Sequence, residues 1–298
     1  MTITAGMVKD LREKTGVGMM ECKKALTETN GDMDKAIVWL REHGMARAQK
    51  KEGRVAAEGV VEVFVNPEQN AGVLVELNCE TDFVSKNEEF RALAHDIAKL
   101  AFQHKAKDHE ELLGLKLGAQ TVKDKLTELI AKIGENMQVR RVKVVHTATG
   151  VVTGYSHMGG RIGTLVVLEG AKGDDVVELG KDLAMHVAAA SPRYLVETEV
   201  NASELDQERE IARKRLEEEG KPAELIEKIL VGQMKKFYKE VCLIEQAYVK
   251  DPNVTVQKHV DSLKKGLKIA GFARFQLGEG IEKKKEDFAA EVAAQLKK

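Results

Sequence analysis

The 298-residue sequence lacks the features on which several classes of protein depend. Aromatic residues make up 4% of the chain and the formal net charge is -1, so we predict neither the stacking platforms nor the basic surface that usually bind nucleic acid. The three widely spaced cysteines fit a reducing compartment better than a disulfide framework. No apolar run approaches the roughly 20 residues of a membrane span, and the N-terminus has no signal-peptide pattern. We therefore expect a soluble, cytoplasmic protein without direct contacts to nucleic acid or membrane.

Patterns typical of catalytic chemistry are also missing. The sequence has no nucleotide fingerprint and no serine elbow, and its histidines do not stand at metal-ligand spacing from cysteines or carboxylates. Residues 159–163 (GGRIG) precede a strand and lack the ending of a phosphate loop, so they predict a tight turn. Cys79 could be a nucleophile with His95 or His157 as its base, although a buried thiol at a strand end is the simpler interpretation. The sequence thus favours a binding protein without metal or cofactor over an enzyme.

An internal duplication is the main feature that the sequence does contain. Three pairs of segments recur in the same order: residues 59–61 and 150–152, 72–77 and 163–168, and 93–98 and 179–184. The first copy is longer between its second strand and its helix, where residues 81–84 (TDFV) have no counterpart. Loops on rigid scaffolds commonly carry function, so this one-sided loop is the first candidate site. In the alternative, Phe83 packs into its own core and Asp82 only caps a turn.

The apolar periodicity predicts helices first and then an alternation of strands and helices. Residues 4–44 predict three short helices, with Asp32 as the N-cap of the third and Gly44 at its end. Residues 46–54 have almost no large apolar side chain and predict a linker or a solvated helix. Residues 56–145 predict two strands, two helices and a strand.

Two further local patterns bear on the candidate loop and on a long insertion. Ser85 and Glu88 have the spacing of a capping box, which would place Phe83 outside the following helix. Residues 195–240 predict a charged antiparallel helical hairpin, with Pro222 at the first position of its second helix. Its apolar stripes are Leu205, Ala212 and Leu216, then Leu225, Ile226, Ile229 and Leu230.

The C-terminal part of the chain predicts a closing strand and a tail helix. The strand residues that alternate are Ile269, Gly271, Ala273, Phe275 and Leu277. An amphipathic helix is expected from Lys285 onward. Together with the duplicated strands and helices, these elements predict an α+β fold.

Several segments resemble the signatures of one protein family. Residues 11–26 (LREKTGVGMMECKKAL) and 76–84 (ELNCETDFV) are the long matches, and residues 133–136 (IGEN) and 272–275 (FARF) are shorter ones. They resemble the bacterial elongation factor Ts family, the guanine-nucleotide exchange factors of elongation factor Tu. The resemblance covers essentially the whole chain, and both long signatures occur in the expected order.

The resemblance implies how the α+β fold is divided. The expected parts are a three-helix ubiquitin-associated-like N-terminal domain, a duplicated core with antiparallel sheets and helices, an inserted antiparallel coiled-coil hairpin for dimerisation and a C-terminal helical module. Their boundaries are residues 1–54, core subdomains at 55–148 and at 149–194 with 241–278, the hairpin at 195–240, and the module at 279–298.

The resemblance also implies a mechanism and a set of contacts. Phe83 would enter the nucleotide-binding domain of GDP-bound elongation factor Tu as a wedge, with Asp82 making polar contacts beside it. The magnesium and phosphate sites of the partner would then be disturbed, and its affinity for GDP would fall. The residues that match contact positions of the family are Thr81, Asp82, Phe83, Val84, Lys23, Ile133, Gly134, His157 and Val249. The chain departs from the pattern at Lys250. An adaptor that binds its partner through the N-terminal helices without exchange is the alternative function.

Overall fold

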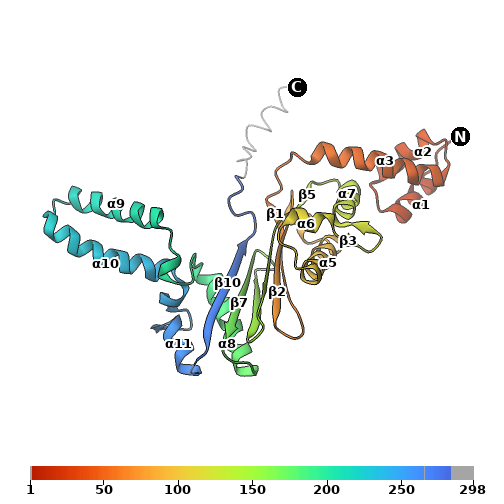
Figure 1. Ribbon diagram of the computed structural model, residues 1–298. Helices are drawn as coiled ribbons and strands as arrows, with labels where there is room; N and C mark the ends of the chain where they lie inside the picture. The colour runs from red at the N-terminus through yellow and green to blue at the C-terminus, as the bar shows by residue number, and fades with distance from the viewer. Residues whose placement is uncertain (1, 265, 283–298) are drawn as a thin grey trace.

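The computed structural model describes residues 2–264 and 266–282 (Figure 1). Within these residues the fold is α+β, because a group of helices at the N-terminus is followed by a mixed core of helices and small antiparallel sheets. This agrees with the fold class predicted from the sequence. The tail helix expected from Lys285, and most of the C-terminal module expected at residues 279–298, lie outside the described residues.

Three helices form the N-terminal unit: α1 (Ala5–Thr15), α2 (Met19–Glu28) and α3 (Met33–Lys51). Their apolar faces share a buried cluster of Val8, Leu11, Cys22, Ala25, Leu26, Ala36 and Leu40. Asp32 caps α3 as predicted, since its side chain accepts a 3.0 Å hydrogen bond from the backbone N–H of Lys35.

The third helix does not end at Gly44, so that prediction is wrong. Gly44 is buried inside α3, and a Cβ atom there would lie only 2.8 Å from the Cβ of Ala131 in α7 (Val122–Ile133). The glycine therefore lets two helices touch and does not mark a helix end. The stretch at 46–54 is helical as far as Lys51, and Ala48 is buried in the core of the first half.

The first half of the duplication is a sheet with strand order β1-β2-β5, covered by helices on one face (Figure 1). The strands are β1 (Glu58–Val65), β2 (Ala71–Cys79) and β5 (Met137–His146). The covering helices are α5 (Glu88–His104), α6 (His109–Gly114) and α7, with the small hairpin β3 (Lys116–Leu117) and β4 (Gln120–Thr121) between the last two.

The second half repeats this arrangement with strand order β10-β7-β6. Its strands are β6 (Val151–His157), β7 (Ile162–Glu169) and β10 (Lys268–Gln276). Its outer face carries α8 (Asp174–Ala190), α11 (Val256–Leu263) and the hairpin of β8 (Ala247–Tyr248) and β9 (Asp251–Thr255). Paired glycines mark the duplication: a Cβ at Gly59 would collide with the carbonyl of Leu77, and one at Gly150 with that of Leu168.

The two sheets pack face to face through a cluster of Val61, Leu74, Val152, Leu165, Val167 and Ala273. Gly72 and Gly163, which correspond in the duplication, make this close approach possible. A Cβ at Gly72 would lie 2.8 Å from the Leu165 side chain, and one at Gly163 would lie 2.9 Å from that of Val63. The sequence repeats thus reflect a pair of similar layers held together by their apolar inner faces.

The closing strand does not alternate regularly over its whole length, so the prediction that Ile269 shares a face with Ala273 is wrong. A register shift between Ile269 and Gly271 interrupts β10. Ile269 therefore packs with the helices of the second half, whereas Ala273 lies between the sheets. A β-bulge of this kind changes the face to which the following side chains point.

The insertion is the predicted helical hairpin of α9 (Ala202–Glu218) and α10 (Ala223–Val241). It projects from the core on the side opposite to α1–α3 (Figure 1). Two predicted details are wrong: Pro222 is the N-cap of α10 and not its first helical residue, and Leu225 is 43% exposed and not part of the apolar stripe. In the described part of the chain, no helix is long and apolar enough to cross a membrane.

Candidate functional site

The loop that only the first half possesses contains a single helical turn, α4 (Asp82–Ser85). The capping-box prediction is wrong, because Asn87 and not Ser85 caps the next helix, α5. The Asn87 side chain accepts hydrogen bonds from the backbone of Glu89 (2.9 Å) and Phe90 (3.2 Å). Phe83 therefore lies in a short helix of its own and not in an irregular loop.

Phe83 is exposed, whereas its neighbour Val84 is buried in the core of the first half. The Phe83 side chain is 80% exposed, so the alternative that it fills its own core is wrong. Asp82 accepts a 2.7 Å hydrogen bond from the Lys86 ammonium, and this bond lowers the pKa of Asp82 below its usual value. The surface at α4 is thus an exposed phenyl ring beside an ionised carboxylate and an ammonium group.

Glu135 fixes the N-terminal end of α4. Its carboxylate accepts hydrogen bonds from the backbone N–H of Thr81 (2.9 Å) and from the Thr81 hydroxyl (2.6 Å). One residue further on, the backbone N–H of Asn136 donates to the Glu80 carboxylate at 2.6 Å. Glu135 was not among the site residues predicted from the sequence, although it lies in the IGEN match at residues 133–136.

These contacts bring two other predicted site residues next to the loop. Ile133 is the last residue of α7, and Gly134 ends that helix in the left-handed conformation, with φ at 92°. The carbonyl of Gly134 accepts a hydrogen bond from the Lys51 ammonium at the end of α3. The turn at residues 133–136 therefore joins the N-terminal unit to the base of α4.

Arg91 holds the other end of α4 and connects it to the second half of the duplication. Its Nε donates to the Ser85 carbonyl and its Nη2 to the Gly159 carbonyl, both at 2.9 Å. Gly159 belongs to the turn between β6 and β7. His157 is the last residue of β6, half-buried and 3.0 Å from the Tyr155 hydroxyl, and Met158 is 68% exposed in the turn.

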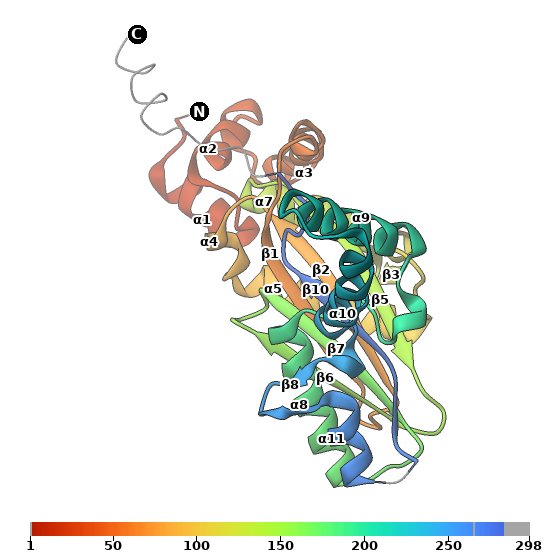
Figure 2. The same cartoon turned by 90° about the vertical axis from the view of Figure 1, so that its left-hand side faces the viewer.

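The last two predicted contact residues lie on separate elements. Val249 is exposed in the turn between β8 and β9, and its backbone N–H donates to Nδ1 of buried His186 at 3.1 Å. Lys250 turns toward α8, where its ammonium pairs with Asp182 at 2.6 Å. Lys23 is exposed on α2. Figure 2 shows α2, α4 and β8 on the same side of the molecule.

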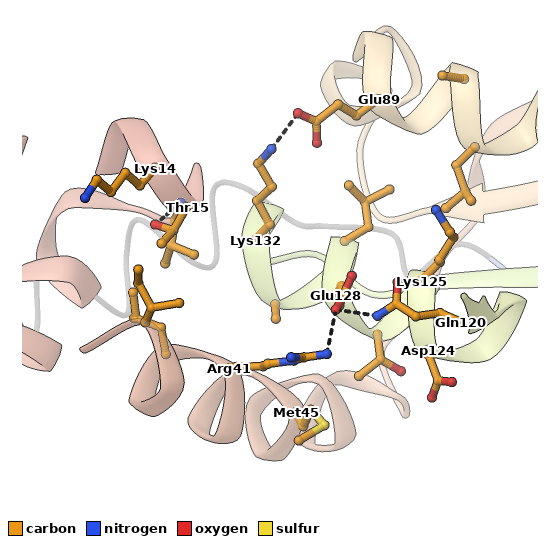
Figure 3. Close-up of a pocket in the computed structure, with 18 of the residues that line it drawn as sticks. Lys14, Thr15, Arg41, Met45, Glu89, Gln120, Asp124, Lys125, Glu128 and Lys132 are labelled. Carbon is orange, nitrogen blue, oxygen red and sulfur yellow. Dashed lines mark hydrogen bonds and ion pairs between the residues drawn. The ribbon is translucent and has the colours of Figure 1, made fainter. Parts of the chain in front are cut away.

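A cleft of about 820 Å³ separates the N-terminal unit from the first half (Figure 3). Ion pairs neutralise several of its charged side chains: Lys132 pairs with Glu89 at 2.5 Å, and Arg41 with Glu128 at 3.7 Å. Because the lining contains as many acidic as basic side chains, the cleft does not favour a ligand of either charge.

Comparison with known proteins decides the family. The family described as elongation factor TS matches residues 80–279. Elongation factor Ts of Magnetococcus marinus is 52% identical over 300 residues, which cover 98% of each chain. Elongation factor Ts of Clostridium novyi is 51% identical over 302 residues, which cover 99% of each chain. The chain belongs to the elongation factor Ts family.

Elongation factor Ts is a translation factor of the cytoplasm that promotes nucleotide exchange on elongation factor Tu, and it is not an enzyme that transforms a substrate. The resemblance found in the sequence is thereby confirmed. The family match contains α4, the turn at residues 133–136 and the second half, while the full-length relatives also cover the N-terminal helices.

The surroundings of Cys79 do not make it a nucleophile, and nucleotide exchange in the elongation factor Ts family does not require one. Its thiol is fully buried and donates to the Thr81 carbonyl at 3.1 Å. Burial raises the pKa of Cys79 to about 12, so the thiol stays protonated at neutral pH. The two histidines considered as its base are engaged elsewhere: His95 with Glu62, and His157 with Tyr155.

Proposed function

We propose that the chain accelerates GDP release by pressing Phe83 into the nucleotide-binding domain of GDP-bound elongation factor Tu. The single observation that carries this proposal is the 80% exposure of Phe83 on a helical turn that is tied down at both ends. An aromatic ring that becomes buried in a pocket of a partner contributes strongly to binding, and a rigidly held, exposed ring is suited to that role. Further contacts with the partner are proposed at Thr81, Asp82 and Val84 beside the ring, and at Ile133, Gly134, His157, Val249 and Lys23.

Nucleotide exchange by this route breaks no covalent bond and is driven by the binding energy between the two proteins. Nucleotide affinity in such GTPases depends on preorganised backbone amides, a lysine and magnesium. If Phe83 binds only a distorted conformer, it shifts the partner toward that conformer and lowers its affinity for GDP. The coupling is reciprocal, so GDP must weaken the binding of the exchange factor by the same factor.

Release of a fluorescent GDP from elongation factor Tu, followed by stopped flow, tests the proposal. The wild-type chain should accelerate release strongly. Binding without release would favour the alternative function, an adaptor that uses its N-terminal helices.

The finer architecture fits the same proposal. The helices at residues 1–54 would be a ubiquitin-associated-like domain that helps to hold the partner. The duplicated core, subdomains 55–148 and 149–194 with 241–278, would carry the wedge. The hairpin at 195–240 would dimerise, because Ile211, Leu225 and Val231 are exposed on it. Residues 279–298 are proposed as a separate C-terminal module.

A charge reversal on α2 should weaken binding without slowing the exchange step. In the variant Lys23→Glu we expect the factor concentration for half-maximal GDP release to rise roughly tenfold, because a charge at the rim of an interface mainly affects association. Since Lys23 lies on a different element from α4, the maximal rate of release should not change. Titrating the factor in the stopped-flow assay measures both quantities.

Lys9→Glu is the control for the Lys23 variant, since Lys9 is an exposed lysine on α1 of the same unit. Its titration curve should match that of the wild type. A lower maximal rate in Lys23→Glu would instead place Lys23 in the exchange step, and an unchanged curve would remove it from the interface.

Shortening the hairpin should abolish self-association and preserve exchange. The tip has its own apolar cluster of Ala212, Leu216, Ile226 and Leu230, while the base packs separately around Phe237, Val241 and Cys242. Replacing residues 209–233 with a short glycine-serine linker therefore removes the tip and leaves the base. Light scattering at several concentrations should show only monomers, and GDP release should stay within about twofold of the wild type because α4 is in the other half.

Loss of exchange in the shortened protein, with an unchanged melting temperature, would show that the hairpin belongs to the primary binding site. Unchanged self-association would place the dimer contact elsewhere. Each result rejects a different part of the proposed division of labour.

A further inference from the structure

The arginine at position 91 is the only side chain among the described residues that hydrogen-bonds both α4 and the turn between β6 and β7. Its guanidinium donates through Nε to the last residue of α4, Ser85, and through Nη2 to Gly159. The two acceptors come from different halves of the duplication. Arg91 itself lies in the first turn of α5, which is anchored by the fully buried ring of Phe90.

This bridge matters because α4 cannot hold its own orientation. A helix of one turn is far below the length at which helices are stable in water, so contacts with its surroundings must fix it. Glu135 fixes the start of α4 through Thr81, and Val84 anchors its middle in the core. Arg91 fixes its end, and Phe83 lies between these points.

The guanidinium is suited to this task. It offers several N–H donors in a rigid plane, so that one side chain reaches two carbonyls in fixed directions, whereas a lysine ammonium is a point charge on a flexible stem. The duplication aligns Arg91 with Val177, which cannot form such a bridge. The arginine is thus present only in the half that carries α4.

We propose that Arg91 is a positioning residue for nucleotide exchange, which sets the direction of Phe83 by tying α4 to the turn at residues 158–161. The inference rests on the proposed wedge function of Phe83. The bridge also ties α4 to the turn that contains exposed Met158, so the partner meets α4 and this turn in a fixed relation. Arg91 therefore acts together with Glu135 and Val84 to keep α4 from turning when Phe83 enters the partner.

A double-mutant cycle tests the inference with the full-length chain. The variants are Arg91→Ala, Arg91→Lys, Phe83→Ala and Phe83→Ala combined with Arg91→Ala. At saturating factor, Arg91→Ala should lower the rate of GDP release roughly tenfold, because a small misplacement of a positioned group is enough for such a loss. Arg91→Lys should recover only part of it. In the Phe83→Ala background, Arg91→Ala should change the rate less than twofold, since a positioning residue has no effect once the group that it positions is gone.

Melting temperatures and a control separate positioning from stability. Arg213→Ala removes an arginine that pairs with Glu227 on the hairpin, and it should leave the rate unchanged. The inference is overturned if Arg91→Ala lowers the rate of GDP release by the same factor in the wild type and in the Phe83→Ala background. It is also overturned if the lower rate of Arg91→Ala follows a loss of folded protein at the assay temperature. A wild-type rate in Arg91→Ala beside a slow Phe83→Ala also overturns it but leaves the wedge intact. A wild-type rate in Phe83→Ala rejects the wedge itself.

Discussion

Replacing Phe83 with alanine is expected to slow GDP release from elongation factor Tu about 30-fold or more, while the melting temperature of the chain stays the same. Aromatic side chains that fill a pocket in a partner typically cost about 2 kcal/mol or more when truncated, which corresponds to that factor. Because the ring is 80% exposed, its loss should change the free energy of unfolding by less than about 0.5 kcal/mol. Stopped-flow release and thermal unfolding measure the two effects.

Phe90→Ala is the matched control, because the same type of side chain is fully buried seven residues further along the chain. Truncating a buried phenylalanine costs about 3–5 kcal/mol of stability, so this variant should unfold at a much lower temperature. If Phe83→Ala also unfolds early and loses activity only in proportion to its unfolded fraction, Phe83 is a structural residue and the wedge is wrong.

The second large effect is expected from Glu76, and it concerns stability. Glu76 is fully buried in β2, where its carboxylate pairs with Arg140 at 3.1 Å and with Arg141 at 2.6 Å. It also accepts a 2.8 Å hydrogen bond from the backbone N–H of Gly278, which follows β10. Removing one partner of a buried ion pair costs about 3–5 kcal/mol, because the remaining charges are left uncompensated. The two arginines are partly exposed, so we expect Glu76→Ala to cost about 3 kcal/mol.

Urea unfolding of Glu76→Ala and Glu62→Ala provides the comparison. Glu62 is an acidic residue on the neighbouring strand β1 and pairs with His95 at 2.9 Å near the surface. Exposed pairs of this kind contribute about 1 kcal/mol or less. Equal losses of stability in the two variants would show that Glu76 does not hold the end of β10 to the first sheet.

The duplicated core could be predicted from the sequence because its constraints are local. Gly59 and Gly150 are required by close backbone approaches within each half, and Gly72 and Gly163 by the contact between sheets, so the same residues recur at the same spacing. A glycine has more than one use, however. Gly44 could mark the end of a helix or a close helix contact, and only the neighbouring Ala131 distinguishes these cases.

The candidate site could be predicted in part. The lengthened loop and the family resemblance both indicated Phe83, but its exposure depends on Val84 filling the core in its place. Ser85 and Asn87 are both able to cap a helix, and their spacing alone does not decide between them. The contacts of Glu135 and Arg91 join residues 54 and 68 positions apart, which no periodicity in the sequence can reveal.

The affinity of the chain for nucleotide-free and for GDP-bound elongation factor Tu, measured for the wild type and for Phe83→Ala, tests the central claim most directly. The ratio of the two dissociation constants is the coupling between the exchange factor and GDP. If Phe83 carries that coupling, the wild type should bind the nucleotide-free partner far more tightly, and Phe83→Ala should lose most of this preference while its affinity for the GDP-bound partner stays nearly the same. An unchanged ratio in Phe83→Ala would contradict the account, because the weakening of GDP binding would then come from another part of the interface.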